Sequence, residues 1–412
     1  MSKIYEFVII GAGLAGLTCC KKLREKGVEN LIVLEKNDAP GGLCTTKVID
    51  GHILDVGGGH FFNSRFPDVL EYVFSHLPKD EFNYYERVSK VEIDGHTIDY
   101  PIESNVWQLP LEKRIDYLIS IIRNGESLGK PEPQNFEEWI RWKLGDKVCE
   151  EYMIPYNEKL WGVMPQEMDV DWLYKIPNVN VREVLQYCLE SRQDVTKFPA
   201  HIHFYYPKKG GFGCIVDAIA KDEMPFIKCN TKVTLLERRD DLWLINGELQ
   251  AKNVINTTPW NDLFCALGSP EELREDFSRI RYNRIVVSLY ETEYDVNWHW
   301  RYVPDKRKPF HREFYISNFA QASKKGGMYL ETGEGRFIDN TVQINGASSK
   351  GDFITDAAYP IPVLGHKQAI TNILTYFRPL RLFGVGRWGQ HEYQNADVSM
   401  HEAIQFVEQL ER

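Results

Sequence analysis

The chain has 412 residues, 43% of them hydrophobic and 13% aromatic, enough to bury the cores of two or three domains. Acidic side chains (59) outnumber basic ones (49), and the net charge of −10 argues against a nucleic-acid groove or an anionic membrane surface as a partner. The eight cysteines have no paired metal-ligand spacing, and the N-terminus has no signal-peptide pattern. We therefore expect a reduced, cytoplasmic protein with no membrane span and no metal.

A dinucleotide-binding pattern lies near the N-terminus, in "IYEFVIIGAGLAGLTCCKKLREKGVENLIVLEK". A β-branched run predicts a strand, and the G-x-G-x-x-G spacing of Gly11, Gly13 and Gly16 predicts a tight turn into a helix. Gly13 lets the backbone approach a pyrophosphate, and Gly16 lets the helix pack on the strand. A second strand ends in Glu35, whose carboxylate is placed to accept ribose hydroxyls. A glycine turn with only a structural role is the alternative.

Two further glycine clusters decide which dinucleotide is expected. Gly41 and Gly42 follow the second strand, and "DVGGGHFF" places three glycines directly before His60. These loops have no role in a plain nicotinamide-binding fold, whereas glutathione-reductase-like flavoproteins use such loops against the ribityl chain and the flavin ring. The arrangement resembles that class, so we predict FAD. The alternative for His60 is a histidine satisfied within the core.

The rest of the chain predicts two insertions into this domain. Amphipathic segments such as "FEEWIRWKLG" and "VREVLQYCLESR" predict helices, and the later strand-rich segments alternate with a period of two. We predict an α/β fold: a Rossmann-like, glutathione-reductase-like FAD-binding domain with a helical insert and a second, antiparallel-sheet domain. The predicted boundaries are residues 1–95, 200–262 and 370–412 for the discontinuous FAD-binding domain, 96–199 for the helical substrate domain, and 263–369 for the antiparallel sheet.

Five motifs occur in order along the chain: "YPIESNVWQLP", "PYNEKLWGVMPQEMDVDW", "YPKKGGFG", "AAYPIPVLGH" and "GRWGQHEYQNADVSMHEA". Together with the N-terminal loop they resemble the UDP-galactopyranose mutase family of FAD-dependent nucleotide-sugar mutases over nearly the whole chain. The amine-oxidase and protoporphyrinogen-oxidase clan shares the FAD elements but not the segment "NEKLWGVMPQEMDVDW".

The resemblance implies an isomerase that interconverts the pyranose and furanose forms of a nucleotide-diphosphate sugar. N5 of reduced FAD is the nucleophile at the anomeric carbon, there is no net redox change, and an external reductant is required. Such furanoses serve polysaccharide biosynthesis. The alternative is an FAD-dependent oxidase or dehydrogenase of the wider clan, acting on an amine, a porphyrinogen or a carotenoid-like substrate.

The resemblance also implies the site. The catalytic residues are His60, Arg312, Tyr359 and Tyr393, of which the last three contact the diphosphate. The cofactor-binding residues are Gly11, Gly13, Leu14, Ala15, Gly16, Glu35, Lys36, Gly42, Leu43, Gly58, Gly59, His60, Val233, Arg387, Asn395, Ala396, Asp397, Val398 and Ser399. The alternatives are core tyrosines, a surface arginine, and a structural salt bridge for Arg387.

The helical insert is expected to hold the nucleotide, through Tyr100, Asn105, Tyr156, Asn157 and Trp161, although aromatic residues at such spacings also fill cores. A second cation for the diphosphate is either Lys175 or Arg182, and the sequence does not decide between them. Close relatives often carry an amide where this chain has Glu103. A carboxylate there would repel a uridine diphosphate but could bind extra hydroxyls or an amine. The sugar, the base, the electron donor and a possible homo-oligomeric state therefore stay open.

Overall fold

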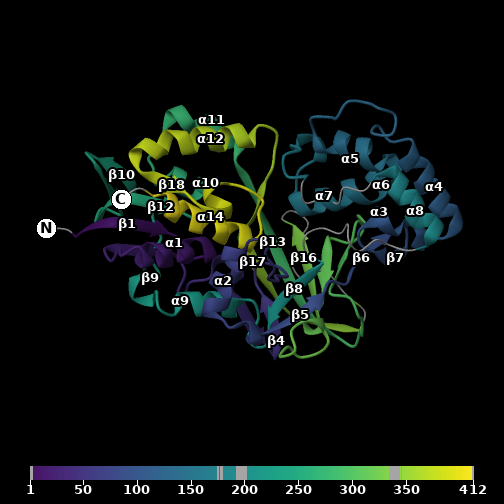
Figure 1. Ribbon diagram of the computed structural model, residues 1–412, viewed down its shortest axis with the longest axis horizontal. Helices are drawn as coiled ribbons and strands as arrows, with labels where there is room; N and C mark the ends of the chain where they lie inside the picture. The colour runs from purple at the N-terminus through teal and green to yellow at the C-terminus, as the bar shows by residue number, and fades with distance from the viewer. Residues whose placement is uncertain are drawn as a thin grey trace.

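The structure of the protein is a computed structural model that describes residues 3–173, 176, 180–191, 202–333, 344 and 346–410. The described residues form two large sheets, two small strand pairs and a helical insert (Figure 1). The predicted fold class is confirmed, because a mostly parallel sheet covered by helices stands beside a largely antiparallel one. In the described part of the chain, no helix is long and apolar enough to cross a membrane.

The first sheet has seven strands, and its central strands are apolar because helices cover both faces. In spatial order its strands are β10 (Leu236–Arg239), β11 (Leu242–Ile245), β12 (Leu249–Asn256), β1 (Ile4–Ile10), β2 (Leu31–Leu34) and β9 (Ile227–Lys228), and β18 (Leu382–Gly384) also pairs with β12. Along β1, Phe7 and Ile9 face one core while Val8 and Ile10 face the other. This alternation places helices on both sides of the strand.

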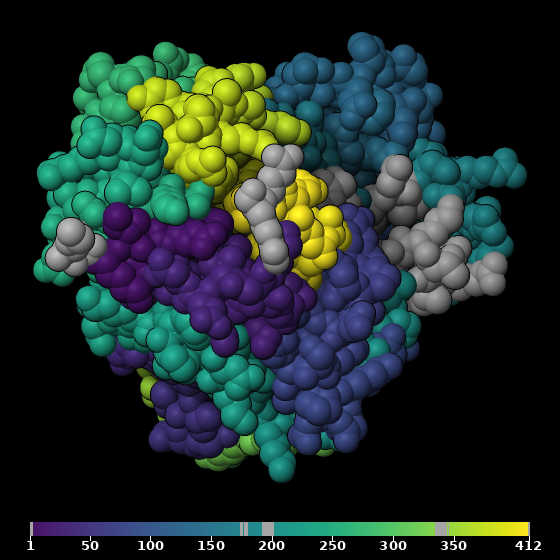
Figure 2. All heavy atoms as spheres, turned by 60° about the vertical axis from the view of Figure 1, so that its left-hand side comes forward, coloured from purple at the N-terminus to yellow at the C-terminus, as the bar shows by residue number. Residues whose placement is uncertain are grey.

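The first of these cores contains α1 (Leu14–Glu25), α2 (Pro67–His76), α9 (Gly213–Ala220) and α14 (Ala396–Gln409). The other contains α10 (Trp260–Phe264), α11 (Arg274–Arg279) and α12 (His366–Phe377). Helices α1 and α14 pack together although they come from opposite ends of the chain. Figure 2 shows the purple N-terminal segment beside the yellow C-terminal one. The two ends of the chain thus build one domain.

The second sheet also has seven strands. In spatial order they are β17 (Ala347–Ile361), β13 (Arg281–Thr292), β16 (Gly327–Gly333), β15 (Arg312–Phe314), β14 (Trp300–Tyr302), β6 (Ser89–Ile93) and β7 (His96–Asp99). All neighbours are antiparallel except β14 and β6. The predicted FAD-binding segment extends to residue 95, but β6 pairs with β14 and so extends this sheet.

The helical insert leaves the second sheet after β7 and packs around its own core. Its helices are α3 (Ile102–Asn105), α4 (Leu111–Ile122), α5 (Phe136–Leu144), α6 (Asp146–Val148), α7 (Ile154–Trp161) and α8 (Val181–Glu190). Gly162 ends α7 in the left-handed region, with φ of 70°, which an L side chain seldom adopts. Ile361, the last residue of β17, and Val363, just after it, belong to the same core and tie the insert to the sheet.

The remaining elements are short. They are the strand pairs β3 (Thr46–Ile49) with β4 (His52–Asp55) and β5 (Phe82–Glu86) with β8 (His203–Pro207), and the helix α13 (Gly386–Gly389). The pair β3–β4 follows the loop after β2, and α13 follows β18. Both positions border the carboxyl ends of the first sheet's parallel strands, where α/β folds bind their ligands.

Candidate functional site

A cavity of about 510 Å³ opens at the carboxyl ends of β1 and β2. The loops after β1, β2 and β12 form its walls together with α13 and the first turn of α14. The residues predicted from the sequence that line it are Gly11, Gly13, Leu14, Ala15, Glu35, Lys36, Gly42, Leu43, His60, Val233, Arg387, Ala396 and Ser399. Its volume and its place in the sheet suit a dinucleotide.

The three glycines of the first loop have different local roles. Gly11 has φ of 98°, and a Cβ there would lie 2.7 Å from the Thr257 hydroxyl. A Cβ on Gly16 would collide with the carbonyl oxygen of Gly11, so only glycine lets α1 start this close to β1. A Cβ on Gly13 would meet only the Cα of Gly42, 4.0 Å away. A larger side chain at Gly13 would therefore extend into the cavity.

Glu35 is held in a fixed orientation at the cavity wall. It is 4% exposed, and its two carboxylate oxygens accept hydrogen bonds from the backbone N–H groups of Ala12 and Asn37, each at 2.9 Å. Each oxygen keeps further acceptor capacity. The side chain can therefore accept a ribose hydroxyl while it stays bonded to the glycine loop.

Arg387 is anchored by backbone carbonyl groups. Its Nε donates to the Gln394 carbonyl at 2.9 Å, and Nη1 donates to the Ala358 carbonyl at 3.2 Å. The bonds join the segment before α14 to β17. Because carbonyl groups carry no net charge, they fix the guanidinium without neutralising it, and a positive charge stays on the cavity wall. These contacts are hydrogen bonds to carbonyl groups and not the structural salt bridge that was the alternative for Arg387.

His60 is a neutral imidazole at the cavity. Burial, followed by the positive charge of Arg387, lowers the pKa of His60 to about 4. Its Nδ1 lies 2.7 Å from the Gly58 carbonyl oxygen, which can only accept, so Nδ1 carries the proton. The other ring nitrogen, Nε2, is then an acceptor. At neutral pH the Nε2 atom of His60 can accept a hydrogen bond, and the ring carries no charge.

Six predicted cofactor residues do not line the cavity: Gly16, Gly58, Gly59, Asn395, Asp397 and Val398. Gly58 and Gly59 face the second sheet instead. A Cβ on Gly58, whose φ is 101°, would lie 3.3 Å from Nη2 of Arg312, and a Cβ on Gly59 would lie 3.3 Å from the Phe314 ring. This glycine loop therefore runs between the cavity, through His60, and the Arg312 guanidinium.

Arg312 forms a buried ion pair across the second sheet. It lies opposite Glu331 in the register of β15 and β16, and its Nε is 3.1 Å from Glu331 Oε2. The other oxygen of Glu331 contacts His311 Nε2 at 3.1 Å and accepts from the Tyr359 hydroxyl at 3.0 Å. Burial alone would raise the pKa of Glu331, but Arg312 and His311 outweigh it and hold that pKa well below its ordinary value.

Glu331 was missed in the sequence, although a signal was present. Every residue of β16, "GMYLETG", is buried, and a lone carboxylate in such a strand needs a cation or several donors. The sequence contained the carboxylate but not the register that brings Arg312 opposite it.

Predicted aromatic residues from distant segments meet beside this ion pair. The ring centroids of Tyr359 and Tyr393 are 5.6 Å apart, and Trp161 lies 5.1 Å from Tyr393. Tyr100 and Tyr156 lie 5.1 and 5.5 Å from Tyr302, a residue that sequence reasoning did not select.

Arg87, which was also missed, adds a second cation. Its guanidinium lies 4.7 Å from the centre of the Tyr100 ring and donates to the Tyr302 hydroxyl at 3.0 Å. The structure does not offer Arg182 in this role, because that side chain is exposed on α8. Lys175 lies outside the described residues.

Two predicted substrate residues are already bonded within the insert. Asn157 donates to the Met153 carbonyl at 2.8 Å and accepts from the Trp161 indole N–H at 3.0 Å. Asn105 is fully buried and donates to the Pro101 carbonyl at 2.9 Å. Trp161 itself is 1% exposed. In this structure these side chains brace the helices behind the aromatic cluster.

Glu103 differs from the ordinary carboxylate that the sequence suggested, because burial favours its neutral form. It is 4% exposed on α3, and burial raises its pKa to about 7 despite the positive charge of Lys143. At neutral pH a large share of its carboxyl groups is protonated. The neutral form both donates and accepts a hydrogen bond, as an amide does.

The raised pKa of Glu103 makes folding stability depend on pH. Because the folded chain keeps a proton that the unfolded chain loses near pH 4.5, the free energy of unfolding should fall as pH rises from about 4.5 to about 7. The contribution is on the order of 3 kcal/mol. Urea unfolding of wild type and Glu103→Gln measures the free energy of unfolding across this pH range. Plotted against pH, the two free energies should converge or cross. Parallel curves would contradict the assignment.

Comparisons with known proteins agree on the fold. Residues 9–76 match the sequence model of the NAD(P)-binding Rossmann-like domain family. The probable UDP-galactopyranose mutase of Klebsiella pneumoniae is 25% identical over 175 residues, 42% of this chain and 45% of that protein, so the match spans about half of the relative's length. The UDP-galactopyranose mutase of Mycoplasma pneumoniae is 20% identical over 417 aligned residues, covering 98% of this chain and 96% of the relative.

Among solved structures, a crystal structure of reduced UDP-galactopyranose mutase superimposes with a TM-score of 0.87 at 22% identity, covering 98% of this chain and 95% of that one. The agreement therefore extends over both sheets and the helical insert. The chain therefore has the fold of a UDP-galactopyranose mutase and is similar in sequence to two curated ones, in agreement with the resemblance of its motifs.

Proposed function

We propose that this protein is an FAD-dependent nucleotide-sugar mutase that interconverts pyranose and furanose forms without net redox change. One observation carries the proposal. A single glycine loop has His60 in the cavity wall and Gly58 beside the Arg312 guanidinium. Arg312 and the Tyr359 hydroxyl both bond to Glu331. A cation beside a cofactor cavity suits a substrate with a diphosphate leaving group.

FAD fits the residues around the cavity. Glu35 is oriented for the ribose, the open space at Gly13 suits the pyrophosphate, and Arg387 adds a positive charge. The first turn of α14, with Ala396 and Ser399 in the cavity wall, offers helix N-terminal N–H groups that would stabilise the negative charge of a reduced flavin. In its reduced form FAD supplies a nucleophilic ring nitrogen, N5, for the anomeric carbon.

The protein's own side chains bind the leaving group and stabilise its charge. Arg312 binds the diphosphate. Glu331 bonds to the guanidinium and holds it, so the position of the guanidinium is set before substrate arrives. The hydroxyl group of Tyr393 adds a neutral donor. The Tyr359 hydroxyl donates to Glu331 and so helps to hold the carboxylate that fixes the guanidinium. Because these groups are largely shielded from water, they stabilise the charge that develops on the departing phosphate more strongly than they would in solvent.

The aromatic cluster of the insert is assigned to the nucleotide base. Tyr100, Tyr156 and Tyr302 offer ring faces and edges for stacking, and Arg87 lies over one of these rings. Glu103, protonated in part at neutral pH, is compatible with an uncharged base edge. We place the enzyme in the cytoplasm, where a diffusible reductant is at hand and the eight cysteines stay free thiols.

The test is turnover with and without reduction of the flavin. The purified, FAD-loaded protein is incubated with UDP-galactopyranose or UDP-galactofuranose, with dithionite in one arm and in air in the other, and thymidine and guanosine diphosphate sugars are run in parallel. We expect interconversion only in the reduced arm. Peroxide release, or bleaching of oxidised flavin by an amine or a porphyrinogen, would instead identify an oxidase and overturn the proposal.

A further inference from the structure

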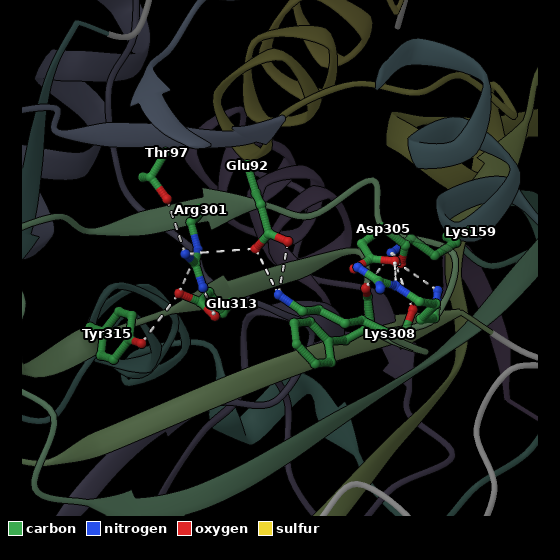
Figure 3. Close-up of polar contacts among 10 residues, drawn as sticks. Glu92, Thr97, Lys159, Arg301, Asp305, Lys308, Glu313 and Tyr315 are labelled. Carbon is green, nitrogen blue, oxygen red and sulfur yellow. Dashed lines mark hydrogen bonds and ion pairs between the residues drawn. The ribbon is translucent and has the colours of Figure 1, made fainter. Parts of the chain in front are cut away.

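A buried lysine joins the helical insert to the second sheet. Lys159 lies on α7 and is 1% exposed. Its ammonium donates to the carbonyl oxygens of Asp305 at 3.0 Å, Lys308 at 3.3 Å and Phe310 at 2.7 Å. All three carbonyls belong to the loop of residues 303–311, which connects β14 to β15 (Figure 3).

The three contacts match the donors of an ammonium group, so the loop is arranged around a cation. The loop is also closed on itself. The Lys308 N–H donates to the Asp305 carbonyl at 3.1 Å, and the Val303 N–H donates to the His311 carbonyl at 2.8 Å. Removing the ammonium would leave converging carbonyl dipoles inside the protein, an unfavourable arrangement.

Charged side chains hold the same loop from the sheet side. Lys308 pairs with Glu92 of β6 at 2.8 Å, and Arg301 of β14 pairs with Glu313 of β15 at 2.9 Å (Figure 3). Arg301 also approaches Glu92 at 3.7 Å. These pairs tie the loop to the sheet, and Lys159 ties α7 to the loop.

The two elements joined in this way carry different parts of the proposed site. Helix α7 carries Tyr156, assigned to the nucleotide base, and the loop leads directly into Arg312, assigned to the diphosphate. A second bond, from the Asn283 side chain to the Leu160 carbonyl at 2.6 Å, fastens the end of the same helix to β13. The distance between base and diphosphate contacts thus depends on this joint.

We propose that Lys159 is a positioning residue that sets the spacing between the base-binding helix and the diphosphate-binding arginine. The inference rests on the proposed function. A ligand that reaches both ends gains from the fixed spacing, because its second contact is made at high effective concentration. A ligand that reaches one end gains nothing from it.

The experiment compares dissociation constants for UDP, uridine and inorganic pyrophosphate on the FAD-loaded protein by calorimetry. In Lys159→Met, UDP affinity should fall by about tenfold or more, while affinity for uridine and for pyrophosphate changes by less than about twofold. Lys159→Gln keeps part of the hydrogen bonding and should give an intermediate loss. The control is Lys306→Met, since Lys306 joins the same loop to Glu158 of α7 through an exposed contact of 3.2 Å.

The outcomes separate this inference from the proposed function. If the wild type binds no nucleoside diphosphate, the proposed function fails. If wild type binds UDP and the lysine variants lose affinity for all three ligands equally, or for none, the positioning role is wrong. Failure of both variants to give FAD-loaded, folded protein would assign Lys159 to global stability and would also overturn the inference.

Discussion

Replacing Arg312 by alanine should lower the rate of interconversion by about 10²- to 10³-fold while FAD stays bound. The guanidinium is the charge assigned to the leaving diphosphate, and loss of one such preorganised contact costs about 10² to 10³ in kcat. Arg312 is not among the residues that line the cofactor cavity, so the visible flavin spectrum should be unchanged. The measurement is turnover of UDP-galactofuranose under dithionite, with flavin content from the absorption spectrum.

The same variant should also be less stable, because Glu331 would be left buried without its main cation. Breaking one side of a buried pair costs about 3–5 kcal/mol. The double variant Arg312→Ala/Glu331→Gln removes both charges and should regain much of the free energy of unfolding without regaining turnover. Turnover close to wild type in either variant would remove Arg312 from the site, and an unchanged stability would contradict the buried pair.

Gly13→Val should yield protein without FAD. The β-branched side chain would extend into the cavity, since only the Gly42 Cα lies within 4.0 Å of a Cβ at this position. Its methyl groups would take the space assigned to the pyrophosphate and would keep the backbone N–H groups away from it. The ratio of flavin absorbance to protein absorbance after purification should fall close to zero, while the far-UV circular dichroism of the fold is retained.

Two companion variants sharpen this test. Gly13→Ala adds only the Cβ and should weaken FAD binding less than valine does. Glu25→Val places the same side chain at the exposed last residue of the same helix and should leave flavin content unchanged. A yellow Gly13→Val protein with full flavin content would mean that the pyrophosphate lies elsewhere.

The glycine loops were predictable from the sequence because their requirements are local. Gly11 needs a left-handed φ, and Gly16 needs the absence of a Cβ against a neighbouring carbonyl. Such constraints depend on residues close in sequence and on one adjacent strand, so a spacing pattern records them.

Other parts of the site depend on contacts that no local pattern encodes. Glu331, Tyr302 and Arg87 reach the site through strand pairing and through packing between segments far apart in the chain. The motif around Asn157 predicted a helix near the substrate, but not that this amide would bond to its own helix. A helical period shows which residues share one face of the helix. It does not show which other element that face will pack against.

The sequence predicted residues 89–93 as part of the FAD-binding segment, whereas they belong to the second sheet. The reason for this difference is related. A period of two indicates a strand with one buried face but does not name its partner. The strand lies close in sequence to elements of the first domain, yet β14, more than two hundred residues later, is its neighbour.

The pairing of α1 with α14 has a consequence for dissecting the domain. Arg387, Ala396 and Ser399 complete a cavity whose opposite wall is built from the loop of residues 11–15, far away in the sequence. A fragment without α13 and α14 would therefore leave the cavity open on one side. Retention of the dinucleotide should depend on both segments.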